Sequence, residues 1–308
     1  MNLSETIEKI FEKNSCYAHP EQAVNQAESL KSLSKDLYTD SKRFIYELLQ
    51  NADDSSLLDV NVDIYIRFFD DIMLLAHTGQ PFTARDIEGL CSVNHGTKKD
   101  SIEKTGFKGI GFKAVFGQSN KVIVYSEGNY FRFDETHNFA WRTEWEQSKE
   151  NWEASNNRTF LYPWQIIPIL TNKEDIPQEI DSFLSSGDWK VATLVHLSNK
   201  QDVENAITEL IENVNMFLFL KNIKSIEFET DNIYKVSISR NNDKIRIHQN
   251  STLKAEWLLY FQQLNIPSEI KEQILPDSNV PDKLKKATSI ELSFAAKIEK
   301  RQLVPLKD

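Results

Sequence analysis

Three polar residues in the segment RFIYELLQNADD, residues 43 to 54, have the types and the spacing of a hydrolytic site. Glu47, Asn51 and Asp54 are separated by four and three residues, which places them in one row along a helix. A carboxylate one helical turn from an amide can orient a water molecule while the amide oxygen binds a hard cation such as Mg²⁺. A solvated polar face is the plainer interpretation, and the segment alone leaves both open.

The elements that must hold this row follow from hydrophobic periodicity. Ile45, Leu48, Leu49 and Ala52 gather on another side of the same helix and predict its buried face. The pattern elsewhere predicts helices over residues 4–11, 20–38 and 83–91, a hairpin over 61–77, and strands over 121–127 and 189–198. Residues 134–188 fit neither period. This first part, residues 1–200, is predicted to form one domain.

A second α+β pattern begins at about residue 201. It predicts a helix over 201–219, a strand over 223–230, a hairpin over 234–249, and strands over 256–261 and 289–299. We therefore expect a second, smaller domain over residues 201–308. Because the sequence stops soon after a strong strand and without a polar tail, we expect the chain to be the start of a longer protein.

Glycines are concentrated in one part of the first domain. Seven of the nine fall between residues 79 and 117, and three of them lie in KTGFKGIGFKAVF, residues 104–116. Glycine lets backbone N–H groups approach a phosphate closely. The segment does not match a P-loop, because Phe112 and Lys113 follow Gly111 where lysine and a hydroxyl residue are required. It also reverses the glycine order of the Rossmann fingerprint, so a phosphate loop and a plain glycine turn both remain open.

Composition excludes several classes of function. The net charge of −10 and the pI of about 5.2 argue against a nucleic-acid-coating surface. No apolar run approaches the roughly 20 residues that span a bilayer, and the N-terminus lacks the pattern of a secretory signal. Cys16 and Cys91 lie far apart and predict neither a disulfide framework nor a zinc site. A cytoplasmic protein that binds neither membrane nor nucleic acid is expected.

Two motifs together resemble a known family. ELLQNADD resembles the N-box of the GHKL ATPases, which include the gyrase B subunit, the ninety-kilodalton heat-shock chaperones and the histidine kinases. GFKGIGFKAVF resembles their second glycine box. The order and separation of RFIYELLQNADDS, HTGQPFT and GFKGIGFKAVF are most similar to the N-terminal ATP-binding domain of sacsin and its plant and bacterial relatives. The resemblance covers approximately residues 20–200.

The resemblance implies roles for particular residues. Glu47 would be the general base, Asn51 the Mg²⁺ ligand and Asp54 a residue on the purine side of the pocket. Thr193 would bond near the adenine. The second glycine box would wrap the phosphates at the base of a lid spanning about residues 92–105, and it comprises Gly106, Phe107, Lys108, Gly109, Ile110, Gly111 and Phe112.

One position departs from the family pattern. Where most members have the Asp of DxGxG, which accepts the adenine amino proton, this chain reads His77, Thr78, Gly79. A neutral imidazole at His77 could accept that hydrogen bond, or Asp54 could replace the missing carboxylate. His77 could equally be an ordinary histidine at the end of a strand.

The resemblance also implies a fold and an activity. The expected fold is the Bergerat α/β sandwich, a two-layer α+β architecture, followed by a smaller α+β domain. The expected activity is slow, Mg²⁺-dependent hydrolysis of ATP to ADP, acting as a conformational switch in a larger chaperone-like or bacterial defence protein. The alternative is a non-hydrolysing nucleotide-sensing scaffold, a pseudo-ATPase. Expected partners besides nucleotide are further domains or another protein, and a homodimer is compatible with the family.

Overall fold

The computed structural model describes residues 2–37, 41–57, 60–92, 111–277, 280 and 282–304. They form two compact units, one of Met1–Glu212 with Leu220–Tyr234 and one of Asn213–Phe219 with Lys235–Asp308. Each unit combines helices with a sheet, so the α+β class expected from the sequence is confirmed.

The sheet of the first unit has seven strands within the described ranges. In spatial order they are β7 (Ile223–Glu229), β1 (Val62–Phe69), β2 (Ile72–His77), β6 (Val191–His196), β3 (Lys121–Ser126), β4 (Asn129–Asp134) and β5 (Ile169–Thr171). The pair of β1 with β7 is parallel, and the other pairs are antiparallel. The sheet is therefore mixed but mainly antiparallel.

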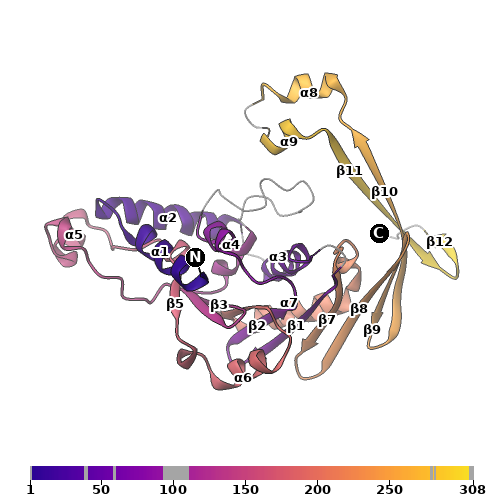
Figure 1. The fold of residues 1–308 in the computed structure, drawn as a ribbon, viewed down its shortest axis with the longest axis horizontal. Coiled ribbons are helices and arrows are strands. Elements are labelled where there is room, and N and C mark those ends of the chain that lie inside the picture. Colours follow the sequence, from indigo (N-terminus) through magenta and orange to yellow (C-terminus); the bar gives the residue numbers. More distant parts are fainter. Residues whose placement is uncertain are drawn as a thin grey trace. The chain divides into compact units, whose positions relative to one another are not determined.

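Helices cover both faces of this sheet. They are α1 (Leu3–Ser15), α2 (Pro20–Leu37), α3 (Ser41–Asp54), α4 (Ala84–Leu90), α5 (Lys149–Asn156), α6 (Gln178–Ser186) and α7 (Lys200–Glu212). Short 3-10 turns are η2 (Gly111–Gly117), η3 (Thr143–Trp145), η4 (Trp164–Ile166) and η5 (Lys173–Asp175). Figure 1 shows α1 to α4 on one face and α6 on the other.

The expected hairpin is present and its register is regular. Phe69 pairs with Ile72 across the turn, and Ile64 pairs with His77 at the far end. Asp70, in the turn, has a φ of 51°. Aspartate tolerates this left-handed conformation, which tight hairpin turns require. The hairpin therefore brings the end of β2, and His77 with it, to a fixed place in the sheet.

The two faces of the central strands bury different sets of residues. On one face, Leu74 and Ala76 of β2 join Ala192 and Leu194 of β6 in a core closed by α6. Because side chains alternate along a strand, Leu75 and His77 point to the opposite face, and so does the residue paired with Leu75. That face is the one on which α3 packs, against β1.

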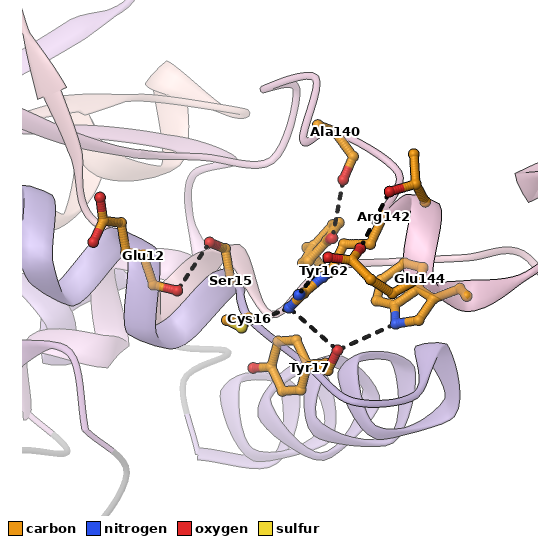
Figure 2. Close-up of polar contacts among 10 residues, drawn as sticks. Glu12, Ser15, Cys16, Tyr17, Ala140, Arg142, Glu144 and Tyr162 are labelled. Atoms are coloured by element: carbon orange, nitrogen blue, oxygen red, sulfur yellow. Dashed lines mark hydrogen bonds and ion pairs between the residues drawn. The ribbon is translucent and has the colours of Figure 1, made fainter.

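A second core is mainly aromatic. Trp145, Trp152 and Phe160 pack with Ala23 and Val24 of α2. Polar contacts join its edge to the end of α1, as Figure 2 shows: the Tyr17 carbonyl accepts from Trp145 Nε1 at 3.1 Å and from the Arg142 guanidinium at 3.4 Å. Arg142 also contacts the Cys16 thiol, while Tyr162 donates to the Ala140 carbonyl at 3.2 Å. These contacts fix the start of the chain against residues 139–162.

The second unit is an antiparallel meander. Its strands, in spatial order, are β8 (Ile233–Asn241), β9 (Lys244–Gln249), β10 (Thr252–Asn265), β11 (Ser289–Glu299) and β12 (Gln302–Val304). Two short helices, α8 (Ser268–Ile274) and α9 (Asp282–Lys286), lie between β10 and β11 in the sequence. The 3-10 turn η6 (Val214–Phe217) joins this unit, where Trp257 Nε1 donates to Asn215 Oδ1 at 3.2 Å. No helix within the described residues is long and apolar enough to cross a membrane.

Candidate functional site

Helix α3 presents the predicted row of polar residues. The predicted apolar face is buried with at most 4% of each residue exposed: Ile45, Leu48, Leu49 and Ala52. Phe44, which was not predicted, is buried as well. Glu47, Asn51 and Asp54 are all half-buried. The row is therefore neither core nor fully solvated surface, and each of its members has an interaction partner.

The Glu47 carboxylate lies against the backbone of the second motif. A Cβ atom added at Gly111 would collide with the Glu47 side chain, whose carboxylate oxygen is its nearest neighbour. Helix α3 and η2, which begins at Gly111, pack against each other. Two segments more than 60 residues apart in the sequence thus meet, and glycine at position 111 makes the close approach possible.

The C-terminal end of α3 meets the end of β2. The Gly79 N–H donates to His77 Nδ1 at 3.2 Å, and the Ser55 hydroxyl lies 3.5 Å from the same nitrogen. Ser55 itself donates to the Ala52 carbonyl at 2.6 Å, while the Gln80 N–H donates to the Ser55 carbonyl at 3.0 Å. A Cβ atom at Gly79 would collide with the Ser55 hydroxyl. These contacts hold His77 and Gly79 directly beside the residue that follows Asp54.

His77 is a neutral imidazole with a defined hydrogen position. The side chain is 6% exposed, and burial lowers its pKa from 6.5 to about 4. Because Nδ1 accepts the Gly79 N–H, the ring proton belongs on Nε2. The acceptor that the sequence analysis assigned to this ring is therefore engaged within the protein, and the ring offers a donor.

Thr193 lies on the same face of the sheet as His77. It pairs with Leu75 of β2 and with Val124 of β3, and it is 5% exposed. His77 is two residues beyond Leu75, so the strand alternation turns both side chains toward the α3 side. The structure thus brings Glu47, Gly111, His77, Gly79 and Thr193 to one side of the sheet.

Two residues that follow Gly111 point into the protein. The Phe112 ring packs against Phe116 and Phe133, with centroids 5.9 and 6.1 Å away, so that only its backbone is left to face a ligand. Lys113 is 2% exposed and its ammonium donates to the carbonyls of Leu90 at 2.7 Å and Gln165 at 3.4 Å. Burial lowers its pKa from 10.5 to about 8. Because protein carbonyls hold its Nζ, Lys113 is not placed to offset the charge of a bound phosphate.

The remaining predicted residues fall outside the described ranges. They are Gly106, Phe107, Lys108, Gly109 and Ile110, together with the expected lid from residue 93 onward. Their roles stay predictions.

Sequence reasoning missed two residues beside the predicted row. Ser55 contacts both His77 and Gly79. Asp53 is 6% exposed, and its carboxylate accepts hydrogen bonds from three consecutive backbone N–H groups at residues 221–223. Both residues lie within the motif NADDS, but a polar residue near a helix end gives no sequence signal for a distant partner.

The described residues do not form a metal cage made only of protein side chains. Across them, no group of three or more His, Cys, Asp or Glu residues is placed to hold a metal ion. Cys16 is an exposed free thiol, and Cys91 is buried, which raises its pKa to about 12. A cation at Asn51 would need further ligands from water or from a bound phosphate group.

Comparison with known proteins concerns the segment that contains most of these residues. Residues 27–175 match the family model of the Sacsin domain. Residues 27–175 form a sacsin-like domain. The match contains α3, the end of β2 and the start of η2, whereas Thr193 lies beyond it.

Two curated proteins are similar to part of this chain. The protein NO VEIN of Arabidopsis thaliana is 35% identical over 116 residues, which are 37% of this chain and 4% of that protein. Human sacsin is 33% identical over 122 residues, which are 34% of this chain and 3% of sacsin. The similarity therefore concerns one segment of two much longer proteins.

Proposed function

We propose that the first unit binds Mg²⁺-ATP and hydrolyses it slowly to ADP, in the manner of a GHKL ATPase with the Bergerat sandwich. The observation that carries the proposal is the contact between the Glu47 carboxylate and the Gly111 position. It places a candidate base against the end of a glycine-rich segment, and these are the two groups that a phosphoryl-transfer site must bring together.

The proposed roles follow from chemistry and position. Glu47 orients the attacking water and takes its proton as the bond to the γ-phosphoryl group breaks. Asn51, one turn along α3, supplies a neutral oxygen for the cation. Mg²⁺, when bound, would neutralise charge that develops on the phosphoryl oxygens. The second glycine box would offer backbone N–H groups to the phosphates.

The adenine of the nucleotide would face different hydrogen-bonding groups from those in most GHKL proteins. His77 offers the Nε2 proton, and this donor suits a ring nitrogen of adenine better than its amino group. Asp54 would then accept a hydrogen bond from the adenine amino group. Thr193, on strand β6, would bond near the adenine. His77→Ala should weaken ATP binding, and equal affinities of the two proteins would remove His77 from the site.

The second candidate function is a nucleotide-binding scaffold without turnover. The observation that favours it is the replacement of the expected carboxylate by His77, whose Nδ1 already accepts a backbone N–H. Under either proposal the unit would act within a longer protein, as the lengths of its relatives suggest. We expect that protein to be chaperone-like or a defence protein of the cytoplasm.

Calorimetric titration combined with phosphate release distinguishes the candidates. Mg²⁺-ATP and a non-hydrolysable analogue are titrated into the wild type, Glu47→Ala, Asn51→Ala and the control Glu88→Ala. Glu88 is an exposed carboxylate on α4 and should behave as the wild type. The ATPase proposal predicts loss of binding in Asn51→Ala, and retained binding with loss of hydrolysis in Glu47→Ala.

Other results would redirect the proposal. Binding without turnover in the wild type would favour the scaffold. Absence of any binding heat at millimolar nucleotide would contradict both proposals for this chain. Phosphate release that persists in Glu47→Ala would remove Glu47 as the base.

A further inference from the structure

Asp53 joins helix α3 to a distant segment of the chain. Its carboxylate accepts from the backbone N–H groups of Lys221 at 3.0 Å, Asn222 at 2.6 Å and Ile223 at 3.0 Å. The Asn222 side chain in turn donates to the Asp53 carbonyl at 2.9 Å. Hydrogen bonds to a charged acceptor are among the stronger ones, and here the acceptor is 6% exposed. This connection is therefore built into the fold.

The segment that Asp53 holds is where the chain returns from the second unit. The chain leaves the first unit after Glu212 and re-enters it at Leu220. The intervening residues Asn213–Phe219 contain η6, in which Phe217 is fully buried. The second unit holds this turn through the bond from Trp257 to Asn215. Asp53 thus holds the chain at residues 221–223, a few residues after the segment ends at Phe219.

The helix that precedes the segment Asn213–Phe219 is also attached to α3. Helix α7, which ends at Glu212, packs against α3, and Lys42 of α3 forms an ion pair with Glu209 of α7. Packing rather than the ion pair carries this attachment, because both charged side chains are substantially exposed. Both ends of Asn213–Phe219 are therefore held by the helix that carries Glu47, Asn51 and Asp54.

We infer that Asp53 is a positioning residue that couples α3 to the second unit through the segment Asn213–Phe219. A displacement of α3 pulls on residues 221–223 through the Asp53 carboxylate, and these residues continue directly into η6. The coupling is reciprocal, because a constraint on η6 restricts α3 through the same bonds. The part of the inference that concerns ligands rests on the proposed nucleotide site, whereas the mechanical connection does not.

Hydrogen exchange of the full chain without ligand tests the connection. Asp53→Asn keeps the shape of the side chain and weakens its three bonds. The matched control is Asp134→Asn, since Asp134 is a 5% exposed carboxylate on β4 that, among the described residues, accepts hydrogen bonds from its sequence neighbours Arg132 and Thr136. Coupling predicts exchange about tenfold faster in residues 214–218 and 255–259 of Asp53→Asn, and no change there in the control. Faster exchange confined to residues 221–223 would show a purely local role and overturn the inference.

A reciprocal variant keeps the test decisive if Asp53→Asn unfolds. Trp257→Phe removes the indole donor to Asn215 in the second unit and leaves α3 untouched. Coupling predicts faster exchange in residues 47–54 and 221–223 of this variant. Unchanged exchange in both segments would contradict the inference from the other side.

Adding Mg²⁺-ATP separates the two proposals. With binding heat measured on the same samples, ligand should slow exchange in residues 214–218 of the wild type, whereas in Asp53→Asn the effect should stop at α3. Binding heat without any effect on residues 214–218 of the wild type would refute the coupling. Absence of binding heat would refute the nucleotide site, and the ligand-free comparison would still decide the coupling.

Discussion

His77 should make the first unit less stable in mild acid, by an amount that its environment determines. The ring is almost completely buried, and its Nδ1 accepts the Gly79 N–H. Burial therefore lowers its pKa to about 4, against 6.5 for an exposed histidine. Below pH 6.5 His77 binds a proton in the unfolded chain, whereas in the folded chain it binds that proton only near pH 4. Stability is thus unaffected above this window and falls as the pH decreases through it.

The magnitude follows from the size of the shift. Each pKa unit corresponds to about 1.4 kcal/mol, so the complete shift is worth about 3 kcal/mol and about 2 kcal/mol of it is lost by pH 5. His77→Asn is the appropriate variant, because its side-chain oxygen can still accept the Gly79 N–H but does not titrate. The wild type should lose about 2 kcal/mol more than His77→Asn between about pH 7 and pH 5.

Urea unfolding followed by tryptophan fluorescence measures this difference. Every tryptophan except Trp257 belongs to the first unit, so the signal reports mainly on the unit that contains His77. The difference between the two proteins cancels the other carboxylates and histidines, which both of them share. Equal losses of stability in the two proteins would contradict this prediction, because they would mean that the His77 imidazole is protonated as easily in the folded as in the unfolded chain.

Three further predictions concern other parts of the first unit. Gly111→Ala should displace the Glu47 carboxylate and lower the rate of phosphate release more than nucleotide affinity, while Gly128→Asn, at a position with open space, should leave both unchanged. Lys113→Met should abolish a gain in stability that the wild type shows between about pH 8 and pH 10.5, where the buried amine loses its charge before the unfolded one does; an identical gain in both proteins would exclude Lys113 as the source. Trp152→Ala should cost about 3–5 kcal/mol in urea unfolding, because the ring is fully buried, and a loss below about 1 kcal/mol would contradict that packing.

Local patterns determine the parts of the fold that the sequence predicted well. Helix α3 has an apolar row that stays in phase with the helical period, and all five of its core residues are buried. The hairpin of β1 and β2 has a clear turn at Asp70. Helix α4 begins at a capping box formed by Thr83 and Asp86, in agreement with the helix predicted over residues 83–91. In each case the decisive interactions lie within a few residues along the chain.

Residues 129–188 could not be predicted in the same way. Strand β4 has adjacent buried residues, Tyr130 and Phe131, because both faces of the sheet are covered there, and this hides the alternation of a strand. Strand β5 has only three residues, and its pairing with β4 is a tertiary interaction. The aromatic residues from Phe139 to Tyr162 pack against one another across loops and against α2. Their spacing in the sequence therefore carries no period.

The same difference between local and tertiary interactions applies to the candidate site. The row of Glu47, Asn51 and Asp54 follows from helical geometry alone. The approach of Glu47 to Gly111 and the bond from Gly79 to His77 depend on how helix and sheet pack. The partners of Asp53 lie about 170 residues away, so no local pattern could indicate them. A polar residue in a motif can thus be found from the sequence, whereas its interaction partners can be identified only from the fold.

Mapping where ATP protects the protein is the direct test of the proposed nucleotide site. Hydrogen exchange is measured on the full chain with and without Mg²⁺-ATP, and Asn51→Ala serves as the control for site-specific binding. Binding of ATP at this site should slow exchange in residues 47–54, 77–80, 111–117 and 191–195 of the wild type and cause no such change in Asn51→Ala. Absence of protection in these four segments of the wild type, or the same protection in Asn51→Ala, would contradict a nucleotide site formed by α3 and the glycine segment.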